Sequence, residues 1–421
     1  MPFSTLGLAP ILTSPLAGKG YLTPTPVQTA AIPLVLSGGD LVARAQTGTG
    51  KTAAFGLPMI DRLFARGPRA ATRAPRALVL VPTRELALQV QVALTTYGAP
   101  LRLRVIEIVG GVSMVRQIQA LRHGADIVVA TPGRLIDHLQ RRTIDLSAVA
   151  VLVLDEADRM LDMGFLPPLR RIAGGLPRER QTLLFSATLT ADVERFSSEF
   201  TRQPKRVDVS SGEVVASTVT HHMHPVALDQ KRALLVHVLA QAPRGQALVF
   251  CKTKRGADRV GDHLEREGLK VAVIHGNKSQ NSRNRSVADF KSGGVTVLVA
   301  TDIAARGLDI AQLPLVVNFD LPLVAEDYVH RVGRTGRAGL TGRAVSFVTA
   351  SDGHLVRDIQ RLLPAPVKQV AIEGFEHAGP RQHTAPARGF TSAVRDGASR
   401  RQPRHHHSRR PHRPQASGAP R

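Results

Sequence analysis

Short apolar runs alternate with longer stretches of helical character along most of the chain. In the first half the apolar runs lie at residues 40–45, 77–83, 104–110, 126–134, 150–158 and 182–188. They are rich in leucine and β-branched residues and nearly continuous, which is typical of strands buried on both faces. Strands of this kind separated by helices predict an α/β domain, with a parallel sheet covered by helices on both sides.

The same pattern restarts in the second half, after a polar stretch from about Gln203 to Thr220. Further apolar runs follow at residues 246–252, 270–276, 295–302, 314–320 and 344–350. A second α/β domain is the simplest interpretation, so we expect domains at 1–206 and 221–368 joined by a linker at 207–220. Residues 369–421 are rich in Arg, His, Pro, Gly and Ser. Such a composition cannot bury enough apolar surface to fold alone, and we expect a disordered basic tail.

The charge of the chain indicates a polyanionic partner. Lys and Arg number 56 against 33 Asp and Glu, a net charge of +23, which favours nucleic acid. From Gly379 onward the tail holds ten Arg and one Asp, or 10 − 1 = +9. This tail is interpreted either as an unspecific RNA tether or as a solubilising end.

The cysteine content and the N-terminus bear on the compartment. Cys251 is the single cysteine and lies inside an apolar run, so we expect a core residue and no intrachain disulfide. The N-terminus lacks the pattern of a signal peptide, and no apolar run approaches the roughly 18 residues that span a bilayer. We therefore expect a cytoplasmic protein without a membrane partner.

The segment "AQTGTGKT", residues 45–52, lies between an apolar run and a probable helix. Strand, Gly-rich loop and helix form the context of a phosphate-binding site. Backbone N–H groups of residues 48–52 would face phosphates, Lys51 would reach the β and γ oxygens, and the Thr52 hydroxyl would bind Mg²⁺. Ala45 replaces the usual first glycine, which says only that φ there can be negative.

A pair of carboxylates follows the four apolar residues that begin the segment "VLVLDEAD", residues 151–158. Asp155 and Glu156 stand at the carboxyl end of the expected strand, where α/β sheets bind ligands. Asp155 would hold Mg²⁺ through its water shell, and Glu156 would orient and deprotonate the attacking water. Together with the Gly-rich loop, this pair predicts a nucleotide-hydrolysing enzyme.

Seven motifs occur in the order typical of one family: "AQTGTGKT", "PTRELA", "TPGR", "DEAD", "SAT", "ATDIAARGLDI" and "HRVGRTGR". Over about residues 3–365 the chain resembles the DEAD-box RNA helicases, of the RhlE-like bacterial subgroup, whose phosphate loop also begins with alanine. The resemblance implies two tandem RecA-like parallel-sheet domains with a cleft between them. It also implies RNA-stimulated hydrolysis of ATP with Mg²⁺, coupled to local unwinding of short RNA duplexes.

The resemblance also implies roles for individual residues. Gln28, helped by Thr23, would bond the adenine edge with Phe3 nearby, and Asp309 would contact the ribose. The implied nucleotide-binding residues are Phe3, Thr23, Gln28, Ala45, Gln46, Thr47, Gly48, Thr49, Gly50, Lys51, Thr52 and Asp309. The implied catalytic residues are Lys51, Asp155 and Glu156, with Arg334 and Arg337 as arginine fingers on the γ-phosphate. Ser186 and Thr188 would bond towards Asp158, and His330 would link the nucleotide and RNA sites.

RNA would be held by both domains, mainly through phosphates and sugars. The implied contacts are Thr83, Arg84, Gly111, Thr131, Arg134, Thr253, Gln280, Arg283 and Thr301. Backbone contacts bind without reading sequence, and 2′-hydroxyl contacts give the preference for RNA. The chain has 4% aromatic residues and no Trp, so base-stacking platforms are not expected.

Two other functions remain in view. A DNA-translocating helicase is disfavoured by the adenine-reading segment and by "DEAD" itself. An ATP-gated RNA clamp or chaperone, for which unwinding is incidental, shares every motif. The subgroup further implies ribosomal precursors or RNA-decay complexes as partners, and we expect a monomeric core.

Overall fold

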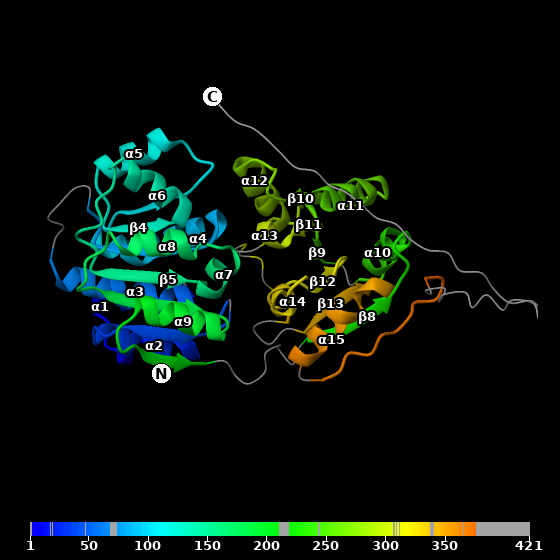
Figure 1. The fold of residues 1–421 in the computed structure, drawn as a ribbon, viewed down its shortest axis with the longest axis horizontal. Helices are drawn as coiled ribbons and strands as arrows, with labels where there is room; N and C mark the ends of the chain where they lie inside the picture. The colour runs from blue at the N-terminus through cyan, green and yellow to red at the C-terminus, as the bar shows by residue number, and fades with distance from the viewer. Residues whose placement is uncertain are drawn as a thin grey trace, which may run out of the picture. The chain divides into compact units, whose positions relative to one another are not determined.

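The computed structural model describes residues 2–16, 18, 20–46, 48–67, 74–209, 219–242, 245–305, 308, 310, 312–336, 341–363 and 365–375. Thr47, Asp309 and Arg337 of the expected site lie outside these residues, as do residues 210–218 and the tail from residue 376. The described residues form two parallel sheets, each accompanied by helices, which confirms the expected fold class (Figure 1). Residues 2–209 are called the first lobe and residues 219–375 the second lobe below.

The first lobe is built on a seven-stranded sheet with the order β3-β4-β2-β5-β6-β1-β7, and every neighbouring pair is parallel. Its strands are β1 (Leu41–Arg44), β2 (Ala77–Leu80), β3 (Val105–Ile108), β4 (Ile127–Ala130), β5 (Val151–Asp155), β6 (Gln181–Ser186) and β7 (Lys205–Asp208). Its α-helices are α1 (Pro10–Thr13), α2 (Pro26–Leu36), α3 (Lys51–Ala65), α4 (Arg84–Gly98), α5 (Met114–Arg122), α6 (Pro132–Gln140), α7 (Ala157–Asp162), α8 (Leu166–Ala173) and α9 (Ala191–Phe200). Two 3-10 turns, η1 (Phe3–Leu6) and η3 (Ala99–Leu101), complete the lobe.

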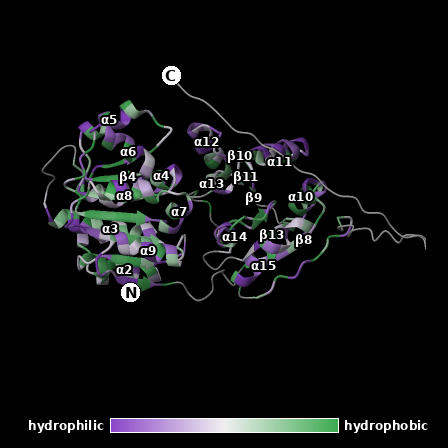
Figure 2. Cartoon of the chain, viewed as in Figure 1, coloured by the Kyte–Doolittle hydropathy of each residue, from purple (hydrophilic) through white to green (hydrophobic). Residues whose placement is uncertain are grey.

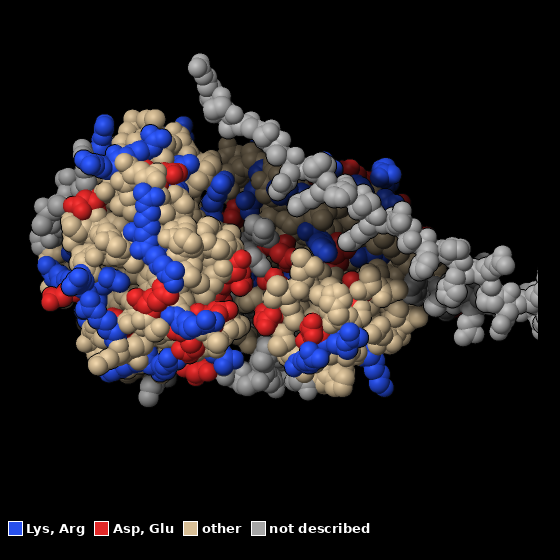
Figure 3. All heavy atoms as spheres, viewed as in Figure 1, with Lys and Arg blue, Asp and Glu red and all other residues tan. Residues whose placement is uncertain are grey.

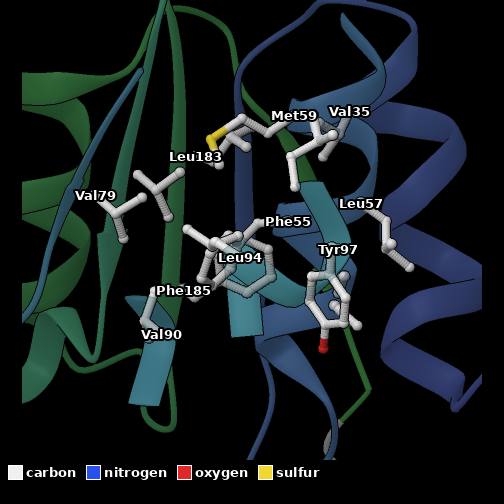
Figure 4. Packing of buried hydrophobic residues seen from close by; sticks show 14 of the residues in the cluster. Val35, Phe55, Leu57, Met59, Val79, Val90, Leu94, Tyr97, Leu183 and Phe185 are labelled. Atoms are coloured by element: carbon white, nitrogen blue, oxygen red, sulfur yellow. The ribbon is translucent and has the colours of Figure 1, made fainter. Parts of the chain in front are cut away.

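Side chains of these strands alternate between two apolar clusters, one on each face of the sheet. Leu183 and Phe185 of β6 pack in the cluster under α2, α3 and α4, whereas Leu184 packs in the other cluster under α6, α8 and α9. The rings of Phe55 and Phe185 lie 5.4 Å apart in the first cluster, where Figure 4 shows them beside Leu94. Burial on both faces explains why these strands are apolar throughout, and Figure 2 draws them largely green.

The second lobe repeats this architecture with a six-stranded parallel sheet of order β10-β11-β9-β12-β13-β8. Its strands are β8 (Val219–Pro225), β9 (Ala247–Cys251), β10 (Val271–Ile274), β11 (Val297–Thr301), β12 (Leu315–Asn318) and β13 (Gly342–Val348). Its helices are α10 (Lys231–Ala240), α11 (Lys254–Arg266), α12 (Gln280–Lys291), α13 (Asp302–Ala305), α14 (Ala325–Val332) and α15 (Gly353–Leu362), with the 3-10 turn η4 (Ala350–Asp352). Cys251 ends β9 with no exposed surface, and burial raises the pKa of its thiol.

Two edge strands were not marked by an apolar run. β7 ends at Asp208 and β8 begins at Val219, so strand residues occupy both ends of the stretch 207–220. In β7 only Val207 is buried, and β8 reads Val-Thr-His-His-Met-His-Pro. An edge strand has one sheet neighbour and partial cover, so its composition carries a weaker apolar signal than that of a central strand. The domain boundaries stay a prediction.

The surface charges and the apolar content of the helices can be compared with the expected partners of the chain. Figure 3 shows Lys and Arg interspersed with Asp and Glu on the face in view. Among the helices that the structure describes, none combines the length and the apolar content that a bilayer crossing requires.

Candidate functional site

The Gly-rich loop connects the end of β1 to α3, and its glycines have backbone angles that other residues avoid. Gly48 and Gly50 have φ values of 83° and 89°. A Cβ on Gly50 would lie 2.3 Å from the Gln28 Nε2, so a side chain at this position would collide as well as strain the backbone. Ala45 is fully buried, and its N–H donates to the Ser186 carbonyl at 2.9 Å. The loop is therefore fixed at the N-terminus of a 15-residue helix, where anions bind.

Lys51 is the first residue of α3 and is 6% exposed. Its buried Nζ has no hydrogen-bond partner among the residues that the structure describes. A buried ammonium without a partner is costly, so this position fits an anionic ligand that supplies the missing acceptors. Lys51 lines a cavity of about 810 Å³ together with Thr52, Asp155 and Glu156.

Asp155 ends β5 and is 2% exposed. Burial raises the pKa of its carboxyl group to about 6, against the opposing effect of the Lys51 charge. Its Oδ1 accepts a hydrogen bond from the Glu156 N–H at 3.0 Å. A buried carboxylate and the Thr52 hydroxyl on one cavity are the hard oxygen ligands that Mg²⁺ prefers, so these residues fit the expected metal.

Glu156 has a backbone conformation that is rare for a residue with a side chain. Its φ and ψ are 54° and 53°, in the left-handed region, at the N-terminal cap of α7. Such a conformation costs about 1–3 kcal/mol and persists only where the surroundings enforce it. The buried carboxylate lies 3.4 Å from the Arg159 Nε, and its Oε2 has no hydrogen bond within the described part of the chain. The atom 3.4 Å from Arg159 is this same Oε2, so Arg159 holds one side of the carboxylate through a buried ion pair.

Asp158 connects α7 to the loop after β6. Its Oδ2 accepts hydrogen bonds from the Ala187 N–H at 3.0 Å, the Thr188 N–H at 3.1 Å and the Thr188 hydroxyl at 3.2 Å. The Asp158 N–H in turn donates to the Ser186 hydroxyl at 3.4 Å. The structure therefore brings together Asp158, Ser186 and Thr188, three of the four residues expected to take part in coupling.

The segment before α2 meets the Gly-rich loop through Gln28, which is 2% exposed. Its Oε1 accepts from the Thr25 N–H at 2.9 Å, and its Nε2 donates to the Gly50 carbonyl at 3.1 Å. Because an amide offers two donors and two acceptors, one of each remains for a ligand. Phe3 is buried and Thr23 is exposed.

Tyr21 is a residue of this segment that sequence reasoning missed. Its ring packs edge-on against Phe3, with 6.3 Å between centroids, and its hydroxyl lies 2.6 Å from that of Tyr97. Both tyrosines line the cavity that contains Lys51. The signal for Tyr21 was available as the aromatic residue in "GYLTPTPVQ", whereas Tyr97 on α4 has no signal in the sequence.

The residues expected to bind RNA stand at equivalent places in the two sheets. In the first lobe they follow the ends of β2, β3 and β4, and in the second lobe they follow or end β9, β10 and β11. The orders β3-β4-β2 and β10-β11-β9 show that each trio is adjacent at one side of its sheet. The residues are Thr83, Arg84, Gly111, Thr131 and Arg134 in the first lobe, and Thr253, Gln280, Arg283 and Thr301 in the second.

Several of these residues also shape the loops that they occupy. The Thr83 and Thr253 hydroxyls accept hydrogen bonds from the first turns of α4 and α11 and thereby cap these helices. Gly111 has a φ of 76°, and a Cβ there would lie 2.1 Å from the Arg84 Nη1. Within the described residues Arg84 has no hydrogen bond or ion pair, so its guanidinium stands against this glycine with its donors available.

Some of the residues expected to bind RNA already contact other groups of the protein. Gln280 and Arg283 both contact the buried Glu85, at 2.7 and 3.0 Å. Thr131 directly precedes Pro132, the first residue of α6, and is 9% exposed. Arg134 already donates hydrogen bonds to other groups of the protein. The RNA roles of these residues stay predictions.

Helix α14 leads to the arginine expected to act as a finger. Arg334 is 5% exposed, its Nη1 donates to the Leu308 carbonyl at 2.6 Å, and it lines the cavity that contains Lys51. His330 is half-buried on the same helix. The neighbouring Arg331 was missed by sequence reasoning and holds Asp302 with two hydrogen bonds at 2.6 and 2.7 Å, which ties α14 to the end of β11.

These features define a class of protein, an α/β nucleotide-binding protein with a phosphate loop and paired carboxylates at the carboxyl edge of its first sheet. The family model for the DEAD/DEAH box helicase matches residues 25–196, and that for the helicase conserved C-terminal domain matches residues 230–339. The chain is 42% identical over 379 residues to the DEAD-box ATP-dependent RNA helicase CshA of Bacillus licheniformis, covering 88% of this chain and 77% of that protein. It is 40% identical over 393 residues to the ATP-dependent RNA helicase DeaD of Mycobacterium tuberculosis, covering 93% and 69%.

A solved structure agrees with these relatives. S. cerevisiae Dbp5 bound to RNA and ADP BeF3 is similar with a TM-score of 0.79 and 31% identity, covering 88% of this chain and 95% of that one. The chain belongs to the DEAD-box ATP-dependent RNA helicases. Its family activity is that of an enzyme that hydrolyses ATP and unwinds RNA, as the sequence predicted, whereas the RhlE-like subgroup stays a prediction.

Proposed function

We propose that this helicase opens short RNA duplexes locally, by bending one strand across both lobes when ATP draws them together. The observation that supports this most directly is the division of each sheet edge. In the first lobe the ends of β1, β5 and β6 carry the nucleotide and coupling residues, and the ends of β2, β3 and β4 carry the expected RNA contacts. The second sheet offers an equivalent trio for RNA.

ATP is the substrate at the first of these positions. Lys51 neutralises the β and γ phosphates, the loop N–H groups cradle them, and Glu156 orients the attacking water and accepts its proton. Mg²⁺ would be held by Thr52 and Asp155 and would supply positive charge beside the phosphates. Arg334 stabilises the charge that develops on the γ-phosphate, with Arg337 as a second finger.

Coupling follows from the need for both lobes. Because Arg334 belongs to the second lobe and Lys51 to the first, a complete catalytic site exists only in the closed state. ATP and RNA each favour that state by binding it more tightly, so each ligand strengthens the binding of the other. Asp158, through its bonds to Thr188, carries the arrangement of α7 to the loop after β6.

Paired measurements on matched RNA and DNA duplexes test this function. We expect RNA to stimulate ATP hydrolysis and short RNA duplexes to separate, with little response to DNA. Equal stimulation by DNA would support a DNA helicase. Stimulation by RNA and stable RNA binding without strand separation would support the ATP-gated clamp or chaperone.

Replacing Gln28 with Ala should weaken ATP binding and narrow the preference for ATP over GTP. The amide of Gln28 is buried and rigidly held between Thr25 and Gly50, so a purine with mismatched polar groups would leave buried groups unpaired. Competition between ATP and GTP for the binding site measures the ratio. Gln119 is exposed on α5, and Gln119→Ala serves as the control. An unchanged ratio in Gln28→Ala would remove the adenine-reading role.

The cellular role is proposed from chemistry alone. Contacts to phosphates and sugars suit many RNA sequences, as remodelling of ribosomal precursors or RNA-decay complexes requires. We propose that the core acts there as a cytoplasmic monomer that also displaces proteins from RNA. The part of the tail that carries the +9 charge, residues 379–421, lies outside the described residues, and this charge supports a role as an unspecific tether.

A further inference from the structure

A buried polar cluster lies beside the expected RNA contacts of the first lobe, and it contains two residues without an assigned role. Gln117 of α5 is 5% exposed, and His138 of α6 has no exposed surface. The Gln117 side chain bonds to the loop after β3 and to two residues of α6, and the His138 side chain bonds to Gln117 and to Thr143. A buried polar group is costly unless it is satisfied, so a fully bonded cluster such as this one specifies a single local arrangement.

The amide of Gln117 has bonds that only an amide can make together. Its Nε2 donates to the Val109 carbonyl at 2.9 Å. Its Oε1 accepts from the Arg134 Nη1 and from the His138 Nε2, both at 3.0 Å. These partners fix which end of the amide is oxygen and which is nitrogen. A carboxylate could not donate to Val109, and an apolar side chain could satisfy none of the three groups.

The same bonds pin both ends of the loop that contains Gly110 and Gly111. Val109 is held by Gln117, and the Val112 carbonyl accepts from the Arg134 Nη1 at 2.9 Å. Arg134 is itself held by Gln117, and its Nε lies 3.5 Å from the Asp137 Oδ2. One glutamine therefore sets the position of the loop and of the guanidinium that flanks it.

His138 fixes Gln117 from the side away from the loop. Because Gln117 Oε1 is an acceptor, the proton of a neutral His138 ring stands on Nε2. The one proton of the Thr143 hydroxyl is then offered to Nδ1 at 2.8 Å and to the His138 carbonyl at 3.1 Å. Burial lowers the pKa of His138, and the charge of Arg134 and that of Arg141 lower it further, against Asp137. The ring is thus neutral at pH 7 and acts as a fixed donor.

The other side of the loop faces Arg84, which is also among the residues expected to bind RNA. A Cβ on Gly110 would lie 3.1 Å from the Arg84 Nη2, and one on Gly111 would lie 2.1 Å from its Nη1. The Arg84 guanidinium therefore packs directly on both glycines. A shift of the loop would displace Arg84 on one side and Arg134 on the other. Gln117 and His138 would thus affect RNA binding although neither is itself an expected RNA contact.

We propose that Gln117 is a positioning residue for RNA binding, which holds the Gly110–Gly111 loop and Arg134 in the arrangement that receives the RNA backbone, with His138 as its support. The inference rests on the proposed RNA path along the ends of β2, β3 and β4. It predicts a defect confined to RNA. None of the hydrogen bonds described for Gln117, Arg134 and His138 reaches the nucleotide site at the ends of β1, β5 and β6.

The experiment compares the full chain with Gln117→Ala and the matched exposed control Gln119→Ala. We expect Gln117→Ala to raise the RNA concentration for half-maximal ATPase about tenfold, since three bonds that involve a charged or buried group are lost. The maximal rate at saturating RNA and the affinity for a fluorescent ATP analogue should stay within about twofold of the wild-type values. Gln119→Ala should match the wild type within about twofold in all of these measurements.

Further variants separate positioning from general stability. Gln117→Glu keeps the acceptor for Arg134 but loses the donor to Val109, and it should also weaken RNA binding while unfolding at a temperature close to that of the wild type. His138→Gln retains a donor near Nε2 and should bind RNA better than His138→Leu. Equal losses of RNA and ATP affinity with a lower unfolding temperature would overturn the inference. So would unchanged RNA affinity in Gln117→Ala while the wild type binds RNA, whereas failure of the wild type to bind would instead refute the proposed function.

Discussion

Replacing Glu156 with Gln should reduce ATP hydrolysis by at least about 100-fold and leave ATP binding nearly unchanged, a loss of roughly 2.7 kcal/mol of transition-state stabilisation. The change is nearly isosteric, so the left-handed cap of α7 and the packing against Arg159 remain. What is lost is the carboxylate that we propose as the acceptor for the proton of the attacking water. Because ATP would then stabilise the closed state without being hydrolysed, RNA should dissociate more slowly in the presence of ATP.

Single-turnover hydrolysis and binding of a fluorescent ATP analogue measure the two quantities separately. Glu179 is exposed in the same lobe, and Glu179→Gln provides the same chemical change away from the cavity. Near-normal turnover in Glu156→Gln would mean that another group acts as the base. A parallel loss of ATP binding would mean that Glu156 contributes to the ground state.

Replacing Arg334 with Ala should reduce RNA-stimulated hydrolysis by about 100-fold or more, while the first lobe should still bind ATP. The guanidinium is buried in the cavity that Lys51 lines and is held by the Leu308 carbonyl, so its position does not depend on a flexible side chain. Its charge is needed when negative charge develops on the γ-phosphate, and binding alone needs it less. The defect should therefore appear in the maximal rate.

Steady-state ATPase at saturating RNA, together with ATP titration in the absence of RNA, checks this expectation. Arg361 is exposed on α15, where it forms a surface ion pair with Asp358, so Arg361→Ala is a suitable control. Arg334→Lys tests whether charge alone suffices, because lysine lacks the planar fork of donors. If ATP affinity and hydrolysis fall equally in Arg334→Ala, the residue is a ground-state contact.

The central strands of both sheets were predictable because burial on two faces demands a near-continuous apolar run. β5 is an example, with all five residues from Val151 to Asp155 buried. β8 was not predictable in the same way, because it lies at the sheet edge and mixes polar with apolar residues. His221 and His222 are partly covered and His224 is buried. Besides its pairing with β13, the strand has a single bridge within the described residues, from Met223 to Gln369. Its seven-residue register with β13 arises from tertiary pairing, which no local pattern of the segment announces.

The candidate site divides along a similar line. Lys51, Asp155 and Glu156 follow strands whose ends converge, so their residue types and order suffice to place them together. Gln117 and His138 are 21 positions apart in two different helices, and neither helix has a motif that names them. Their importance becomes visible only when the direction of each donor and acceptor is known. Sequence reasoning therefore found residues expected to touch ligands and missed those that hold them in place.

The buried thiol of Cys251 has a practical consequence for following this enzyme at work. It is the single cysteine of the chain, it has no exposed surface, and burial raises its pKa, so thiol-reactive dyes should leave the native protein unlabelled. A cysteine introduced at an exposed position in each lobe, such as Gln119 and Arg259, would then be modified selectively. Energy transfer between two dyes could record opening and closing in single molecules, without first removing a cysteine from the core.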